Sequence, residues 1–391
     1  STDIALQNAS AEISAAGSYS MGDTAYTALV EIDRLALADI MPDVPLHKLR
    51  MRIEAQGCGL DIFGKETKYD VRAEIDTLHF ADYRLRSINA KASQADNVSL
   101  ITVEGSDNSL LFGIDATSVL KASGISNHTT IELTKADLKA IGAVDSTMQI
   151  STTIDIAATT DFNETHRLEL AGTETSIATT RHRFTPTDLL LSFATSPAMT
   201  DIKVENGDLN IDGRMDCGYK ALLDALQKIA TMNSHMMSGK SELYHLHDYE
   251  EVLPSISLDF TCGEKNMLHN FLAFNGIEAK GIEAVADISK SKGLNIKGDI
   301  IKLRTAGIAL DSIKFATRQN HDRLAYIIGA TELSIASDDE ENSQSALLYG
   351  SIKCDTITSN FILRDNIKKT DSKAGLTALI KPGNMHIHFN P

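Results

Sequence analysis

Two short segments place histidines two residues apart, the spacing at which side chains share one face of an extended strand. Residues 245–248 read His-Leu-His-Asp, and residues 386–388 read His-Ile-His. Paired imidazoles are common zinc ligands, but a zinc site needs three or four converging ligands. No third ligand follows either pair at a fixed spacing, so we expect surface histidines and no metal site.

Four cysteines lie far apart in the chain, at Cys58, Cys217, Cys262 and Cys354. None belongs to a C-x-x-C pair, so neither a zinc ribbon nor thioredoxin-type chemistry is supported. In an oxidising compartment, where disulfides persist, we expect Cys217 to pair with Cys262. The reason is that each of these two cysteines stands just before one of the two helices expected below.

The sequence carries no pattern of a known catalytic centre: no G-x-S-x-G elbow, P-loop, H-E-x-x-H or dinucleotide fingerprint. Carboxylates number 53, too many for any pair of them to indicate a glycosidase. The formal glycosylation sequon at residues 127–129 is short enough to arise by chance. Because no nucleophile, base and orienting group can be named together, we expect a protein that is not an enzyme and needs no cofactor.

The charge balance excludes one class of partner. Lys and Arg number 37 against 53 Asp and Glu, which gives a net charge of −16. Such a chain has no basic footprint for nucleic acid, and bulk charge does not draw it to anionic lipid. No apolar run is long enough for a membrane helix, whereas 391 residues are ample for a sizeable core.

The elements that would position any site are strands. Residues 49–56 and 69–76 alternate between apolar and polar or charged side chains, the period of a strand with one wet face. Short polar breaks separate many such runs, which predicts a meander of antiparallel hairpins. We expect one apolar concave surface, with Arg50, Arg52, Arg72 and Glu74 on the opposite, water-facing side; its lining is Leu49, Met51, Ile53, Val71, Ile75, Leu110, Phe112 and Ile114.

The period changes to three and four in two places, which predicts short helices near 217–232 and 264–275. We therefore expect a first β-groove segment over 1–212, a helical connector over 213–252 and a second β-groove segment over 253–391. The leucine stripe of the first helix suits core packing, and it would also suit a partner helix. Residues 1–25 form a weak strand or a linker, and 189–193 a strand.

A sheet with one apolar face must hide that face. A β-sandwich hides it against a second sheet, whereas a curled groove hides it and leaves room for acyl chains. We expect the second solution: a mostly β, elongated antiparallel sheet curled into a groove. The first solution remains an alternative, in which the chain is an extracellular or periplasmic module that binds glycan or protein.

Three stretches also carry a resemblance to a known family. They are residues 68–90; residues 202–211, which read Ile-Lys-Val-Glu-Asn-Gly-Asp-Leu-Asn-Ile; and residues 253–258 with 275–276 and 310–313. Together they resemble the TamB (translocation and assembly module) proteins and the wider AsmA-like group, in the versions found in Bacteroidetes-type bacteria. The similarity extends over most of residues 26–335, and its motifs are strand patterns without a catalytic signature.

The resemblance implies a fold, a compartment and partners. Members are anchored in the inner membrane by one N-terminal helix, cross the periplasm, and form an extended β-groove with an apolar inside. They are associated with phospholipid transport between the two membranes and with the biogenesis of outer-membrane proteins. The implied partners are phospholipid acyl chains and an outer-membrane barrel protein, the latter contacted through a region outside this chain. Because the anchor is absent and the chain is short for the family, we expect an internal fragment.

Overall fold

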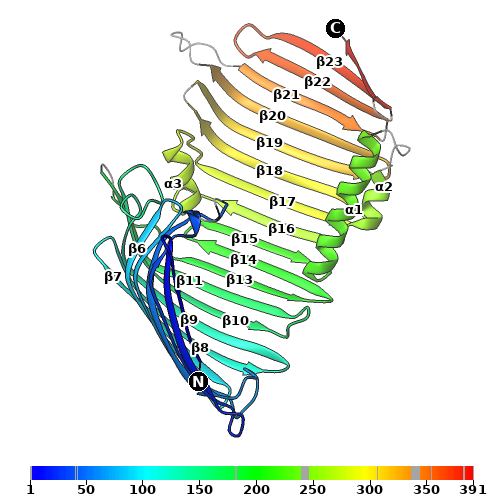
Figure 1. Ribbon diagram of the computed structural model, residues 1–391. Helices are drawn as coiled ribbons and strands as arrows, with labels where there is room; N and C mark the ends of the chain where they lie inside the picture. The colour runs from blue at the N-terminus through cyan, green and yellow to red at the C-terminus, as the bar shows by residue number, and fades with distance from the viewer. Residues whose placement is uncertain are drawn as a thin grey trace. The chain divides into compact units, whose positions relative to one another are not determined.

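The chain folds into one long antiparallel β-sheet with three short helices (Figure 1). The computed structural model describes residues 2–39, 41, 43–180, 183–238, 246–305, 307–335, 344–353, 355–381 and 384–390. Over these residues the sheet has 24 strands and is not closed. The predicted fold class, a mostly β antiparallel sheet compatible with a curled groove, is therefore confirmed.

The chain divides into two compact units, Ser1–Leu189 and Leu190–Pro391. The strands of the first unit pair in chain order, with the two-residue strand β12 beside β11. They are β1 (Thr2–Gln7), β2 (Ala11–Tyr19), β3 (Ala25–Leu35), β4 (Leu46–Cys58), β5 (Lys68–Phe80), β6 (Tyr83–Ala95), β7 (Val98–Asp107), β8 (Leu110–Lys121), β9 (Gly124–Asp137), β10 (Met148–Thr160), β11 (His166–Thr179) and β12 (Arg183–Phe184).

The second unit continues the meander and carries the helices. Its helices are α1 (Tyr219–Met237), α2 (Leu246–Val252) and α3 (Met267–Phe274). Its strands are β13 (Leu189–Ser196), which begins at the last residue of the first unit, β14 (Met199–Asn206), β15 (Leu209–Met215), β16 (Ile256–Cys262), β17 (Gly281–Ser289), β18 (Gly293–Arg304), β19 (Ile308–Asn320), β20 (Arg323–Ile335), β21 (Gln344–Ile352), β22 (Thr356–Asp365), β23 (Thr370–Lys381) and β24 (Asn384–Asn390).

The division into units differs from the boundaries expected at 212 and 253. β15 pairs directly with β16, so the segment with α1 and α2 is an insertion between two neighbouring strands. The sheet is continuous across this insertion, because the backbone N–H and C=O groups of β15 need a partner strand and β16 supplies it. Both expected helices exist, and α2 is a third, shorter one.

Two expectations for single segments can be compared with the strands. Residues 189–193 lie in β13, as the alternation predicted. Residues 1–25, expected as a weak strand or a linker, contain β1 and β2 and the start of β3. The β6–β7 turn has positive φ at both Asp96 and Asn97, 52° and 63°. Positive φ at both central residues is the geometry of tight hairpin turns whose twist matches the flanking strands.

The amount of exposed surface shows how little of the sheet is covered. The chain exposes 23967 Å², against about 15,000 Å² for a compact monomer of its mass. Among the described residues, only ten apolar side chains are buried. Most apolar side chains of the sheet faces are therefore half-buried, which indicates one layer instead of two packed layers.

Candidate functional site

Cross-strand pairing gathers one small or apolar side chain from each strand β1 to β10 into a single row. Residues directly opposite each other in an antiparallel pair place their side chains on the same face of the sheet. The row contains no charged or polar residue, and it defines what we call the first apolar face. Its members are Ile4, Ala15, Val30, Ile53, Ala73, Ala90, Val103, Ile114, Ile131 and Ile154.

The register brings all eight predicted lining residues onto this face. Ile53 and Ile114 belong to the row itself, and Val71 lies in the row beside it, opposite Ala55 and Ala92. A further parallel row runs from Met51 through Ile75, Ile88 and Gly105 to Phe112, with Leu49 and Leu110 nearer the strand ends. All eight side chains are half-buried. That these residues bind lipid stays a prediction.

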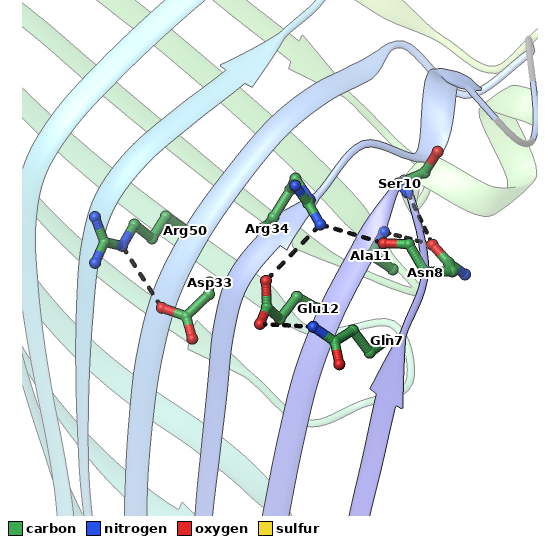
Figure 2. Close-up of polar contacts among 8 residues, drawn as sticks. All are labelled: Gln7, Asn8, Ser10, Ala11, Glu12, Asp33, Arg34 and Arg50. Carbon is green, nitrogen blue, oxygen red and sulfur yellow. Dashed lines mark hydrogen bonds and ion pairs between the residues drawn. The ribbon is translucent and has the colours of Figure 1, made fainter.

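The opposite face is charged, as expected. Arg50, Arg52, Arg72 and Glu74 are exposed. Arg52 lies 2.8 Å from Glu31 and 2.7 Å from Glu54, and the hydrogen bond to Glu54 raises its pKa. Figure 2 shows the neighbouring pairs, Arg50 with Asp33 and Arg34 with Glu12. Water screens exposed pairs of this kind, so they contribute little stability and instead mark the wet side.

One end of the first apolar face is covered by residues 59–67, the loop between β4 and β5. Gln94 lies on the apolar side by register, opposite Tyr69. Its Nε2 donates to the carbonyl of Ile62 at 2.7 Å, and Asn97 Nδ2 donates to that of Phe63 at 2.6 Å. The loop therefore rests on the apolar side. It leaves Gln94 4% exposed, and Gln94 Oε1 has no hydrogen-bond partner among the described residues.

The same loop shows that the first unit is curled. The ring of Phe63 meets that of Phe162, in the β10–β11 turn, edge to face with centroids 5.6 Å apart. In a flat sheet, β6 and β10 would be about 19 Å apart, four strand spacings. Curling of the sheet and the reach of the loop together close this gap. Figure 1 shows the accompanying change of strand direction within this unit, from β6 and β7 to β10.

The other ends of the same strands are bridged by residues 138–147, which connect β9 to β10. The backbone N–H of Arg84, next to the β5–β6 turn, donates to the carbonyl of Ile141 at 3.1 Å. Ile141 is buried, and so is Ala136, which lies opposite the lining residue Leu110. Both ends of the strands are thus covered, whereas the middle of the first apolar face stays accessible.

The second unit has an equivalent surface, the second apolar face. Its central row runs from β14 to β23 and again contains no polar side chain. An added Cβ at Gly298 would collide with the ring of Phe315, so the glycine makes room for the aromatic side chain. The row is Val204, Ile211, Phe260, Ala284, Gly298, Phe315, Ile328, Leu348, Phe361 and Ala374.

Sequence reasoning did not place this second face among the site residues. The signal was present, because residues 282–288 and 294–300 alternate as residues 69–76 do. What a single sequence could not show was the register, which decides whether neighbouring runs point to one side. Each unit thus has one face with a cross-strand row of small or apolar side chains.

The helix α1 does not use its whole leucine stripe for packing. Ala225 is 5% exposed and Leu222 half-buried, whereas Leu223 and Leu226 are 58% and 49% exposed. The core interpretation thus fits only part of the stripe, and a partner helix on the exposed part stays a hypothesis. Tyr249 of α2 donates to Asn233 of α1 at 2.8 Å, which ties the two helices together.

The histidine pairs do not form a metal site in the part of the chain that is described. His247 Nδ1 lies 2.7 Å from Asp322 Oδ1 in the β19–β20 turn, and its ring stacks on His321 at 5.7 Å. This hydrogen bond raises the pKa of His247. His245 lies outside the described residues, and His386 and His388 are exposed on β24.

The expected disulfide between Cys217 and Cys262 is wrong, and Cys58 is free as well. Cys217 follows β15, at the end where Met215 pairs with Ile256. Cys262 is at the far end of β16, about 20 Å along the strand from Ile256. A disulfide needs Cα atoms within about 7 Å. Each cysteine does precede a helix, but the helices lie at opposite ends of the strands. Cys354 lies outside the described residues.

No family model matches the chain, and neither does any curated protein or solved structure. Among the helices described, none is both long and apolar enough to cross a membrane. The functional argument consequently rests on the geometry of the two apolar faces.

Proposed function

We propose that this chain is a non-enzymatic lipid-binding scaffold that holds phospholipid acyl chains on its apolar faces. The observation that supports it is the row from Ile4 to Ile154, which crosses neighbouring strands without a polar residue and is half-open to solvent. An exposed continuous apolar surface of this extent marks an interaction site. Acyl chains suit it because binding them requires apolar area alone.

The energy available is adequate without a specific site. Each methylene buried against an apolar surface contributes about 0.8 kcal/mol, so eight methylenes would contribute about 6 kcal/mol. The side chains at the centre of the row are small or β-branched, including Ala73, Ala90 and Val103. They give a smooth floor on which a flexible chain can lie in several positions.

The proposal extends to the role that the resemblance implies. A TamB-like or AsmA-like protein would use such faces in the periplasm to support phospholipid transport between the inner and outer membranes, and to support outer-membrane protein biogenesis. An inner-membrane anchor and an outer-membrane barrel partner would belong to regions outside this chain. These parts rest on the resemblance of residues 68–90, of residues 202–211, and of residues 253–258 with 275–276 and 310–313.

The alternative of a glycan-binding or protein-binding β-sandwich is less well supported. A sandwich buries its inner faces between two sheets. In the described ranges the strands form one sheet, and the lining residues are half-buried where a sandwich core would be fully buried. No observation favours this function, and we do not propose it.

Photo-crosslinking tests the proposal. A photoreactive amino acid at position 53 or 75 lies on the first apolar face, whereas one at position 52 or 74 faces water and serves as the matched control. Cells that express each variant are irradiated, and the purified protein is analysed for covalently attached phospholipid by mass spectrometry. We expect lipid at 53 and 75 only. Equal capture at all four positions, or none at any, would show that the face is ordinary core.

A further inference from the structure

A pocket of about 320 Å³ lies beside α3, where β17 begins and β18 ends. Three cations line it: Lys280, Lys302 and Arg304. The acidic residues Glu264 and Glu278 line it as well, and so do His269 and Ala273 of α3. Among the described residues, none of the three cations forms an ion pair. In a chain of net charge −16, such a cluster is a local exception.

The pocket continues the second apolar face. Ile282 lies opposite Ile300, and Ile300 opposite Ile313, in a row parallel to the central one. Lys280 is two residues before Ile282, and its backbone N–H donates to the carbonyl of Ile301 at 2.9 Å. Lys280, directly before β17, therefore lies next to the end of this apolar row. A molecule with acyl chains and an anionic head has the matching order of groups.

α3 carries two exposed aromatic side chains near the pocket, on another face of the helix. Phe271 and Phe274 are 64% and 73% exposed, and they are one turn apart, so they share a face of the helix. The pocket-lining residues His269 and Ala273 are on a different face, because each residue advances the helix by about 100°. Large aromatic side chains exposed at this level, flanked by cations, are typical of a helix that lies in a membrane interface.

The anchoring of α3 is rigid, which distinguishes it from a loosely attached turn. Asn266 caps the helix, accepting from the N–H of His269 at 2.7 Å and donating to Asp208 at 2.6 Å. Asn206 accepts from the N–H of Met267 at 2.6 Å. Asn206 and Asn266 are each 1% exposed. Because these hydrogen bonds fix the start of α3, the side chains of Phe271 and Phe274 stay exposed to solvent.

We infer that α3 and the adjoining cationic pocket dock on the surface of an anionic phospholipid bilayer. Phe271 and Phe274 enter the acyl region, and Lys280, Lys302 and Arg304 bind lipid phosphate groups. This inference deepens the proposed function by naming where lipid passes between a membrane and the second apolar face, and it rests on that function for its biological meaning. The local charge overrides the net charge because screening limits electrostatic attraction to about 8–10 Å at physiological salt.

Vesicle flotation with the whole chain tests the inference. The probes are vesicles of phosphatidylcholine, alone or mixed with phosphatidylglycerol. Lys280→Gln/Lys302→Gln removes two pocket cations, and Phe271→Ser/Phe274→Ser removes the aromatic pair. Lys290→Gln/Lys297→Gln removes the same charge from exposed positions of the β17–β18 region outside the pocket. We expect the wild type to bind mixed vesicles, each test variant to bind them on the order of tenfold more weakly, and the control to match the wild type.

Other outcomes overturn the inference. Absence of vesicle binding by the wild type would do so, and capture of a protein by a crosslinker at 271 would then identify a protein surface. If only the lysine variant lost vesicle binding, and inorganic phosphate competed with the vesicles for the wild type, the pocket would be a phosphate site without membrane insertion. Equal loss in the control would identify bulk charge. If the lysine variant no longer bound vesicles but still crosslinked to lipid at positions 53 and 75, membrane docking at α3 and lipid binding on the first apolar face would be separate properties.

Discussion

Arg52 and Ile53 are neighbours in β4 and point to opposite faces of the sheet. Arg52 lies 2.8 Å from Glu31 on the charged side, whereas Ile53 lies opposite Val30 and Ala73 in the apolar row. One step along the chain thus separates a side chain that water solvates from one that needs cover. This relationship allows two adjacent substitutions to test different faces of the same strand.

Replacing Ile53 or Ile75 by Asp should abolish lipid capture and lower the free energy of unfolding by about 1–3 kcal/mol, because each puts a charge on a half-buried apolar surface. Replacing Arg52 or Glu74 by Ser should change neither beyond about 0.5 kcal/mol, since exposed pairs contribute little. Urea unfolding and mass spectrometry of co-purified lipid measure the two effects. If lipid still co-purifies with the Asp variants, lipid does not bind at the first apolar face.

Gly105→Val should destabilise the first unit, because an added Cβ at position 105 would collide with the ring of Phe112 across the β7–β8 pair. Overpacking of this kind costs about 1–3 kcal/mol. Gly113→Val is the matched control, because a Cβ there meets nothing within 4 Å. If the collision is the cause, adding Phe112→Ala to Gly105→Val should recover part of the loss in urea unfolding. Equal costs for both glycines would point to strand propensity instead.

The strands were predictable because their signal is local. Residues 49–56 alternate in sequence and in exposure, with Met51 and Ile53 half-buried and Arg52 and Glu54 exposed. A period of two determines which side chains share a side within one strand. The eight lining residues consequently share one face once the strands pair in chain order.

The parts that could not be predicted depend on contacts between distant residues. The Asn-Gly-Asp sequence at 206–208 predicts a hairpin, yet Asn206 and Asp208 also hold α3, about 60 residues later. The disulfide prediction failed because distance along the chain does not give the end of the sheet at which a residue lies. The boundaries expected at 212 and 253 follow the helical insertion, whereas the two compact units meet at 189/190, within the start of β13.

The α2 contact with the β19–β20 turn should weaken as the pH rises. The hydrogen bond to Asp322 raises the pKa of His247, and Asp248 and Glu251 favour the charged form as well. A group with a raised folded-state pKa stabilises fully below its unfolded value of about 6.5, and the stabilisation is lost as the pH rises through the folded-state pKa. Amide exchange, corrected for its intrinsic pH dependence, should therefore accelerate in 246–252 above that pH. His247→Gln should remove this dependence, and an unchanged profile in that variant would contradict the assignment.

Cys217 and Cys262 should behave as free thiols. Burial raises the pKa of both Cys217 and Cys262, which keeps them protonated and slow to react at neutral pH. Alkylation of unreduced protein under denaturing conditions, followed by peptide mapping, should find both modified. A peptide that joins the two cysteines would contradict the separation along β16.

Asn206→Ala should loosen α3 without unfolding the sheet. The side-chain oxygen of Asn206 accepts from the N–H of Met267, and its loss leaves a half-buried donor at the helix start without that partner. Removing a hydrogen-bonding group at a helix N-terminus costs about 1–2 kcal/mol. Hydrogen exchange of residues 266–275 should therefore accelerate by about 5–30-fold, while the exchange of β17 and β18 stays unchanged.

The matched control is Asn210→Ala, because Asn210 is exposed on β15, four residues along the same hairpin. It should leave exchange in α3 unchanged. If α3 docks on a bilayer as a rigid element, Asn206→Ala should also weaken vesicle flotation, although it alters neither a cation nor a phenylalanine. Equal exchange in the two variants would mean that Asp208 and Asn266 hold the helix alone. Faster exchange with undiminished flotation would mean that membrane contact does not require the fixed orientation of Phe271 and Phe274.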